Sequence, residues 1–293
     1  MLAVLTGLCL IAVVAACGER GEPSSTPSAQ PSASSVRPAP GDHQLTLQHN
    51  GLDRTYLLHA PPSYDPNRPS TLVIALHFYP GAGASMRELT GLDARADQDN
   101  ALVAYPDGQG GGFNALVCCG SADDVGFLTA LTDHLVRTWR ADPDRVFLTG
   151  ISNGGDMSFR AAVEGAGRFA AIAVVSGGYS GALTRAEDYV PKAPVSVITF
   201  IGGQDRYAAT FQTGVRTWQR RLRCQPAAKA SNVRGVSQTV ARCADGSEVS
   251  VHTITDMGHS WPGATSGQLA APAAGLSATD LMWEFFKTHP RRA

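Results

Sequence analysis

Ser152 lies in the pentapeptide Gly150-Ile151-Ser152-Asn153-Gly154, which has the pattern G-x-S-x-G. A short apolar run precedes it and a segment with small residues at helical spacing follows it, so the pattern predicts a turn between a strand and a helix. On such a turn the serine hydroxyl is exposed, and the Asn153 N–H faces any oxygen that becomes negative during nucleophilic attack. The same pattern arises by chance in a chain with 31 glycines, and an ordinary structural turn is the alternative.

A serine hydroxyl is a weak nucleophile near neutral pH and needs a histidine base that a carboxylate holds in place. Asp205 directly follows an apolar strand predicted over residues 195–201, and His259 follows another predicted over residues 248–255. This order of serine, aspartate and histidine is typical of a triad built on the ends of parallel strands. We predict Ser152 as the nucleophile, Asp205 as the orienting acid and His259 as the base. The alternatives are that Asp205 caps the next helix and that His259 is an ordinary loop residue.

These residues require a sheet that brings several strand ends to one edge. Strands alternate with helices along the chain, which predicts an α/β fold with a mostly parallel central sheet, flanked by helices on both faces. An antiparallel N-terminal hairpin, over residues 44–48 and 54–59, is predicted at its front edge. The other predicted strands cover residues 71–76, 101–105, 145–148, 169–176, 195–201 and 248–255, and the main predicted helices cover residues 85–97, 123–139 and 279–287.

The composition limits the partners of the protein. With 293 residues, 43% hydrophobic and 17% charged, the chain has enough apolar surface for a large buried core. The net charge is -1 and no run of Lys or Arg could neutralise a phosphate backbone, so we expect no nucleic acid partner. The sequence has no zinc-type Cys and His spacing, and it suggests no metal, no cofactor and no obligate protein partner.

The N-terminus resembles the leader of a bacterial lipoprotein. Residues 2–16 are apolar, but a helix that spans a membrane needs about 20 apolar residues. The run leads into Val14-Ala15-Ala16-Cys17. The resemblance implies a signal peptide over residues 1–17 and a lipid on Cys17 that anchors the protein to the membrane. No Lys or Arg precedes the apolar run, and a cleaved secretory signal without lipid is the alternative. Both interpretations predict an extracellular or cell-surface protein.

Residues 18–41 are rich in Pro, Ser, Ala and Thr, and they contain too few large apolar side chains to offset the entropy of ordering. We predict that this segment is a disordered tether. The catalytic domain is then expected over residues 42–293.

Several motifs in the predicted domain match one enzyme family. Together with the predicted triad, they make the chain resemble the polyhydroxybutyrate depolymerase and feruloyl esterase branch of the α/β-hydrolases, including the bacterial lipoproteins of that type. The resemblance extends from about Arg54 to Phe286. It rests on Gly91-Leu92-Asp93, Tyr105-Pro106-Asp107-Gly108, Phe113-Asn114-Ala115 with Cys118-Cys119-Gly120, Asp123 to Leu128, Ser152 to Met157, and Gly258-His259-Ser260-Trp261-Pro262-Gly263.

The resemblance implies a serine esterase that forms an acyl-enzyme, with Tyr79 and Asn153 as the oxyanion donors. The residues themselves leave the first donor open between Phe78 and Tyr79, because Pro80 has no N–H. Two positions depart from the family pattern: Phe78 stands where a glycine is usual, and Phe113 stands where tryptophan is frequent. Phe78, Tyr79 and Trp261 predict aromatic walls for the site, unless these rings simply pack the loops. The expected substrate pocket contains His77, Phe78, Asn114 and Trp261.

The expected substrate is a soluble small-molecule or oligomeric ester with a feruloyl or short acyl group. The alternative is a polyhydroxybutyrate depolymerase. Two further alternatives are a serine peptidase and a non-catalytic binding lipoprotein.

Four cysteines follow the predicted leader and allow three pairings. A disulfide between Cys224 and Cys243 closes a loop of about 20 residues, which is worth about 3 kcal/mol in the chain-entropy model. We therefore predict this pair. Cys118 and Cys119 then either pair with each other or stay reduced.

Overall fold

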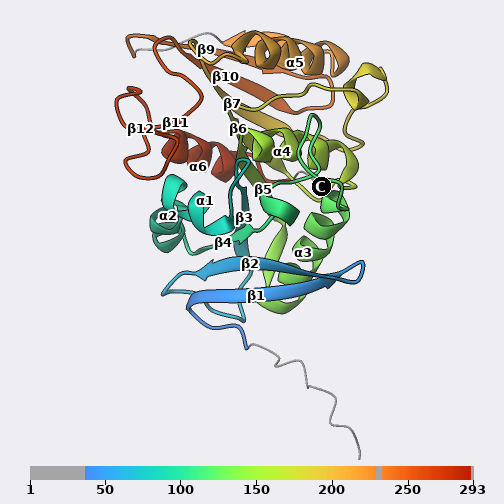
Figure 1. Cartoon of the computed structure of the whole chain (residues 1–293), viewed down its shortest axis with the longest axis vertical. Coiled ribbons are helices and arrows are strands. Elements are labelled where there is room, and N and C mark those ends of the chain that lie inside the picture. Colours follow the sequence, from blue (N-terminus) through green and yellow to red (C-terminus); the bar gives the residue numbers. More distant parts are fainter. Residues whose placement is uncertain (1–36, 229–232, 292–293) are drawn as a thin grey trace, which may run out of the picture. The chain divides into compact units, whose positions relative to one another are not determined.

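A central sheet, ten-stranded within the described part of the chain, organises the fold (Figure 1). Its strand order is β1-β2-β4-β3-β5-β6-β7-β10-β9-β8. The strands from β4 to β10 in this order are parallel, and antiparallel strands flank them at both edges. The strands are β1 (Gly41–His49), β2 (Leu52–Ala60), β3 (Ser70–Leu76), β4 (Ala101–Pro106), β5 (Ala141–Ile151), β6 (Ala171–Val175), β7 (Ser196–Gly202), β8 (Gln225–Ala228), β9 (Val236–Arg242) and β10 (Glu248–Ile254). The mostly parallel sheet and its N-terminal hairpin are confirmed.

The computed structural model describes residues 37–228 and 233–291. Of these, the residues from Pro38 onward belong to one compact unit. The predicted signal peptide, the lipid-attachment residue Cys17 and most of the predicted tether lie outside the described residues and stay predictions. Within the described ranges, every helix is too short or too polar to cross a bilayer.

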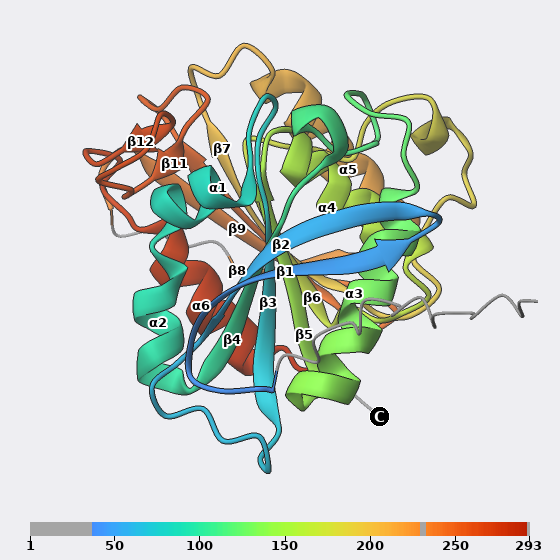
Figure 2. The ribbon, with the colours of Figure 1, turned by 60° about the horizontal axis from the view of Figure 1, so that its bottom comes forward.

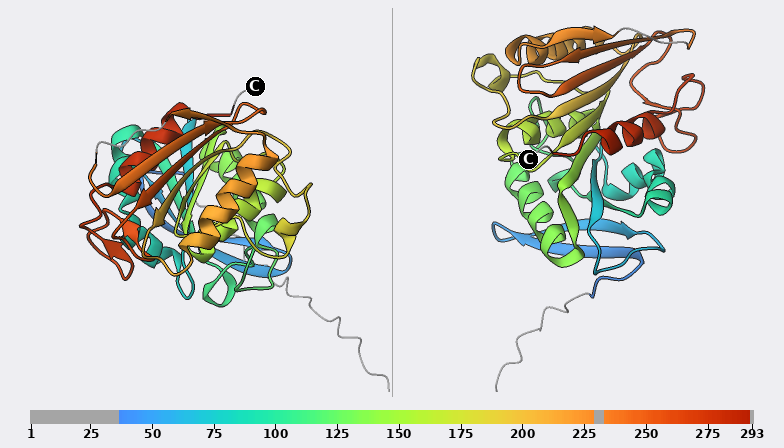
Figure 3. Two further views of the ribbon diagram at one scale, coloured as in Figure 1. Left: turned by 90° about the horizontal axis from the view of Figure 1, so that it is seen from above. Right: turned by 180° about the vertical axis from the view of Figure 1, so that it is seen from behind.

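Helices cover both faces of the sheet (Figures 2 and 3). One face packs against α3 (Asp124–Trp139), α4 (Asn153–Glu164) and α5 (Ala208–Arg221), and the other against α1 (Gly83–Thr90), α2 (Leu92–Asp99) and α6 (Ala278–Thr288). Side chains of β3 alternate between the two layers, with Leu72 and Ile74 in the first and Val73 and Ala75 in the second. Burial on both faces explains why this strand is continuously apolar in the sequence.

The helix predicted over residues 85–97 is two helices. Gly91 ends α1 and precedes α2 with a φ of 57°, and its N–H donates to the Arg87 carbonyl. Glycine enters this left-handed conformation without a Cβ penalty, so it ends a helix where the hydrophobic pattern alone suggests continuation.

The far edge of the sheet contains strands that are not predicted from the sequence. β9 pairs antiparallel with β10, and β8 pairs with β9. Most β9 side chains are exposed or half-buried, so the strand lacks the apolar run that marks the central strands. Beside this edge a disulfide joins Cys224 to Cys243, as predicted. A second disulfide joins Cys118 to Cys119, which was one of the two alternatives for that pair.

Candidate active site

Ser152 occupies the turn between β5 and α4 with φ 56° and ψ -121°. A residue other than glycine rarely adopts a positive φ, so the surrounding backbone must hold it there. The Ser152 N–H donates to the Val175 carbonyl at 3.0 Å, and the Ser152 carbonyl accepts from the Asp156 N–H at 2.9 Å. A Cβ at Gly150 would lie 2.3 Å from the Gly154 carbonyl oxygen, so the turn requires this glycine. The Ser152 side chain is half-buried at the carboxyl edge of the sheet.

Asp205 and His259 meet at the same edge. They follow β7 and β10, which are parallel neighbours. The two loops touch, since a Cβ at Gly202 would lie 2.2 Å from the Gly258 carbonyl oxygen. His259 Nδ1 lies 2.7 Å from Asp205 Oδ2, and the other carboxylate oxygen accepts the Tyr207 N–H at 2.9 Å. Because a carboxylate oxygen only accepts, the neutral imidazole paired with it carries its proton on Nδ1 and has Nε2 as an acceptor.

The different solvent exposure of the Asp205 and His259 side chains suits a proton transfer from the substrate side to His259. The Asp205 side chain is 0% exposed, whereas that of His259 is 29% exposed, so the carboxylate is shielded and the imidazole reaches solvent. Within the described residues, the Ser152 hydroxyl makes no hydrogen bond to His259. Catalytic hydrogen bonds of this kind often shorten only when substrate binds. The roles of the three residues stay predictions.

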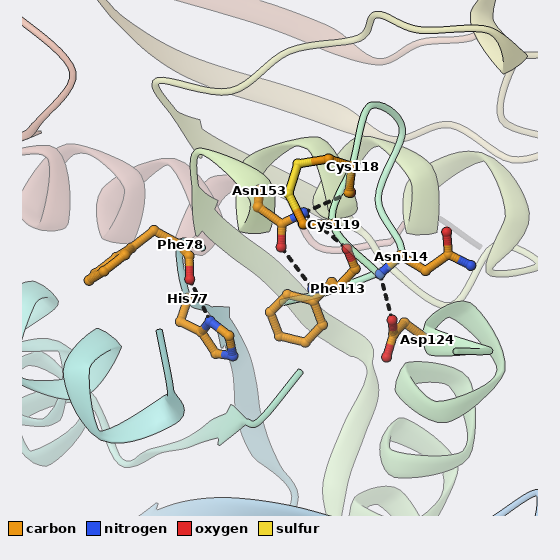
Figure 4. The surroundings of a disulfide bond; sticks show 8 residues. All are labelled: His77, Phe78, Phe113, Asn114, Cys118, Cys119, Asp124 and Asn153. Atoms are coloured by element: carbon orange, nitrogen blue, oxygen red, sulfur yellow. Dashed lines mark hydrogen bonds between the residues drawn. A yellow bond between two sulfur atoms is a disulfide. The ribbon is translucent and has the colours of Figure 1, made fainter. Parts of the chain in front are cut away.

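Asn153 contributes to the site through its backbone N–H and, separately, through its side chain. It is the first residue of α4, and the first N–H groups of a helix have no partner within it. Its buried side chain contacts the loop that carries the adjacent cysteines (Figure 4). Oδ1 accepts the Phe113 N–H at 2.8 Å, and Nδ2 donates to the carbonyls of Phe113 at 3.0 Å and Cys118 at 2.9 Å. The sequence analysis identified the N–H but not this second contact.

His77, which the sequence analysis places in the expected substrate pocket, joins two loops inside the protein. It is completely buried and both of its ring nitrogens are occupied. Nδ1 donates to the Phe78 carbonyl at 2.7 Å, and Nε2 accepts the Gly108 N–H at 2.9 Å. Burial lowers the pKa of His77, which favours this neutral form. The residue therefore joins the loop after β3 to the loop after β4.

Two of the three side chains that were predicted as aromatic walls are also buried. Trp261 is 0% exposed and donates its Nε1–H to Thr279 Oγ1, so it packs beneath the loops. Phe78 is 6% exposed and lies in the core layer against α1, and its ring points away from Asn153 in Figure 4. The half-buried Asn114 side chain donates to the Ala122 carbonyl, which engages it within its own loop. Tyr79, in contrast, is 50% exposed.

Two aromatic residues that sequence reasoning missed lie beside His259. The Tyr207 ring centroid is 6.0 Å from that of His259 in an edge-on arrangement, and the Phe211 ring is 6.4 Å away. Tyr207 is 44% exposed and has the Arg206 guanidinium over its ring at 4.7 Å. The sequence feature that could have identified Tyr207 is its position two residues after Asp205.

Asp156 is a buried carboxyl group one helical turn beyond Ser152. It accepts the Gly178 N–H at 2.7 Å, and burial raises its pKa to about 7 from 3.8. A raised pKa means that the folded state binds the proton more tightly than the unfolded state. The carboxyl thus contributes its full stability below about pH 3.8 and loses that contribution as the pH rises through about 7.

We therefore expect Asp156→Asn to stabilise the protein at pH 8, by on the order of a few kcal/mol, because the amide oxygen keeps the hydrogen bond and nothing has to ionise. Thermal unfolding of both proteins from pH 4 to pH 8 measures this. The variant's advantage in Tm should grow between pH 4 and pH 7 and then level off. A difference in Tm that is independent of pH would contradict the expectation.

A serine on a tight strand-to-helix turn, followed in the chain by an aspartate and a histidine at the ends of two later strands, has the layout of an α/β-hydrolase. No protein-family model matches the sequence. Among solved structures, the acetyl xylan esterase from Aspergillus awamori is similar with a TM-score of 0.64 at 18% identity, over 84% of this chain and 99% of that one. The α/β-hydrolase fold is thereby confirmed.

Sequence comparison shows the family within this fold. Feruloyl esterase C of Emericella nidulans is 30% identical over 262 residues, which cover 85% of this chain and 90% of the relative. A probable feruloyl esterase C of Aspergillus niger is 30% identical over 258 residues, covering 85% and 87%. The chain belongs to the feruloyl esterase C family, and it is a carboxylic ester hydrolase. The polyhydroxybutyrate depolymerase part of the resemblance stays a prediction.

Proposed function

We propose that the protein is a serine esterase that works through Ser152, Asp205 and His259 and forms an acyl-enzyme. The observation that carries this proposal is the hydrogen bond between His259 Nδ1 and Asp205 Oδ2, 2.7 Å long, at the sheet edge where the β5–α4 turn presents Ser152. It leaves His259 Nε2 free to take the proton of a hydroxyl group.

In the first half of the reaction, Ser152 Oγ attacks the ester carbonyl carbon and its proton passes to His259 Nε2. The negative charge that forms on the carbonyl oxygen is stabilised by the N–H groups of Asn153 and Tyr79. The bond to the alcohol oxygen then breaks, and the alcohol leaves with the proton from His259. In the second half, His259 takes a proton from water as the water oxygen attacks the acyl carbonyl carbon. The bond to Ser152 Oγ then breaks, Oγ takes the proton back from His259, and the acid leaves.

The proposed substrate is a soluble ester of a hydroxycinnamic acid or of a short acyl group. Two exposed tyrosine rings support this choice, Tyr79 after β3 and Tyr207 beside His259, because exposed rings near a reaction centre suit a planar apolar group. The relatives named feruloyl esterase C support the same class. The protein is proposed to lie outside the cell, and a lipid on Cys17 is proposed to anchor it to the membrane.

A substrate panel tests the proposed class. We expect kcat/KM on methyl ferulate and p-nitrophenyl butyrate to exceed that on polyhydroxybutyrate suspensions. In Tyr207→Ala, kcat/KM on methyl ferulate should fall about 5-fold while that on p-nitrophenyl acetate changes much less, since an aromatic contact is worth about 1 kcal/mol. Clearing of polyhydroxybutyrate without turnover of either soluble ester would instead support the depolymerase alternative.

A further inference from the structure

We propose that the Asn153 carboxamide and the Cys118–Cys119 disulfide form a positioning unit for the oxyanion site. The inference rests on the proposed function, because it concerns the two N–H groups that would stabilise the charge formed when Ser152 attacks. Neither the carboxamide nor the disulfide is assigned to the chemistry itself. Their effect is to hold in place the segments that carry the donors.

The Asn153 carboxamide is fully engaged in this task. The residue is 3% exposed, and its side chain makes three hydrogen bonds, all to the loop at residues 113–118. Leaving a buried amide without hydrogen bonds costs free energy, so these bonds keep the loop in a fixed position relative to the turn at Ser152. Since the same residue supplies the Asn153 N–H, the loop directly controls the orientation of one oxyanion donor.

The disulfide fixes the partner side of this contact. A bond between the sulfurs of adjacent residues closes a small covalent ring around the Cys118–Cys119 peptide, so the Cys118 carbonyl has little freedom to rotate. That carbonyl accepts both Asn153 Nδ2 and the Ala115 N–H. The Cys119 N–H in turn donates to the Phe113 carbonyl at 3.1 Å. The cysteine ring and the Asn153 carboxamide lie next to each other, and both restrain the same short loop (Figure 4).

The same loop also contacts the segment of the other predicted donor, Tyr79. A Cβ at Gly112 would lie 2.6 Å from Tyr79 Cδ2 and 3.2 Å from the Cys119 carbonyl oxygen, so the tyrosine ring and the cysteine pair pack against one glycine. Nearby, the Gly81 N–H donates to the Gly111 carbonyl at 3.0 Å. Both oxyanion donors are thus braced by one loop, and release of the disulfide should loosen both.

The disulfide is accessible to a reductant because the Cys118 side chain is exposed. Reduction by a dithiol transfers two electrons and two protons to the cysteine pair, which yields two thiols, and the dithiol ends as a disulfide. Cys224–Cys243 offers a matched control, since that disulfide lies at the β8–β9 edge of the sheet, whereas Ser152 follows the central strand β5.

The experiment compares Cys118→Ser/Cys119→Ser and Asn153→Ala with the control Cys224→Ser/Cys243→Ser. Asn153→Ala keeps the backbone N–H, so any loss reports the carboxamide alone. In the two test variants we expect kcat on p-nitrophenyl acetate to fall about 10- to 100-fold with KM changed less than about 3-fold, because the donors act mainly in the transition state. The inhibition constant of a trifluoromethyl ketone, which forms an oxyanion adduct with the serine, should rise by a similar factor. The control should lower Tm but leave kcat and this inhibition constant unchanged.

A second measurement covers the case in which Cys118→Ser/Cys119→Ser does not fold. In the Cys224→Ser/Cys243→Ser protein, dithiothreitol should lower kcat as two thiols become available to a labelling reagent, and reoxidation should restore it. Full activity with both thiols labelled would overturn the inference, as would a fall in kcat without a change in ketone affinity. If Ser152→Ala is inactive while these variants remain fully active, this inference fails alone. If Ser152→Ala stays active, the proposed function fails first.

Discussion

Ser152→Ala should lower kcat on p-nitrophenyl acetate by about 10⁶-fold, because loss of the nucleophile of a triad leaves only the slow reaction with bound water. KM should change little, since the hydroxyl contributes to the transition state more than to substrate binding. The variant should also lose labelling by a fluorophosphonate probe, which reacts with an activated serine. Initial rates at saturating ester, together with gel-based labelling, measure both effects.

The matched control is Ser63→Ala, which removes an exposed serine hydroxyl whose partner is the Asn100 side chain. It should keep wild-type rates and labelling. The positive φ at this position belongs to the turn, so we expect the variant to keep it. Thermal unfolding shows whether Ser152→Ala is folded. If folded Ser152→Ala kept a tenth of the wild-type kcat, Ser152 would not be the nucleophile.

Asp205→Asn should lower kcat by up to about 10⁴-fold while the protein stays folded. In the wild type the two carboxylate oxygens accept from His259 Nδ1 and from the Tyr207 N–H. An amide has one oxygen and one NH₂ group, so it cannot accept from both, and pairing its NH₂ with Nδ1 imposes the tautomer that cannot take a proton at Nε2. Pre-steady-state acylation with p-nitrophenyl acetate measures the step that should slow.

Asp256→Asn is the control for this variant, because Asp256 is an exposed carboxylate three residues before His259. It should react at close to the wild-type rate. Equal losses in the two variants would mean that general electrostatics near His259, and not the specific contact with Asp205, sets the rate.

Sequence reasoning was most successful where local physics decides. The turn at Ser152 depends on glycines at positions 150 and 154, and a Cβ at either would meet backbone atoms within 2.3 Å, so the requirement is visible in the sequence itself. Strands such as β3 are buried on both faces and therefore appear as continuous apolar runs. Because parallel strands end at one edge, the positions of Asp205 and His259 after their strands sufficed to predict their contact.

Long-range packing decided the rest. Whether an aromatic side chain near the site faces solvent or the core is not a property of its neighbours in the chain, so Trp261 and Phe78 seemed suitable as pocket walls until the tertiary structure placed them inside. Tyr207 comes beside His259 only because β7 and β10 pair across more than fifty residues. The sequence by itself thus determined the order and chemistry of the predicted triad, which depend on local turns and strand ends. The tertiary structure alone decided which side chains surround it, since those contacts join segments that are distant along the chain.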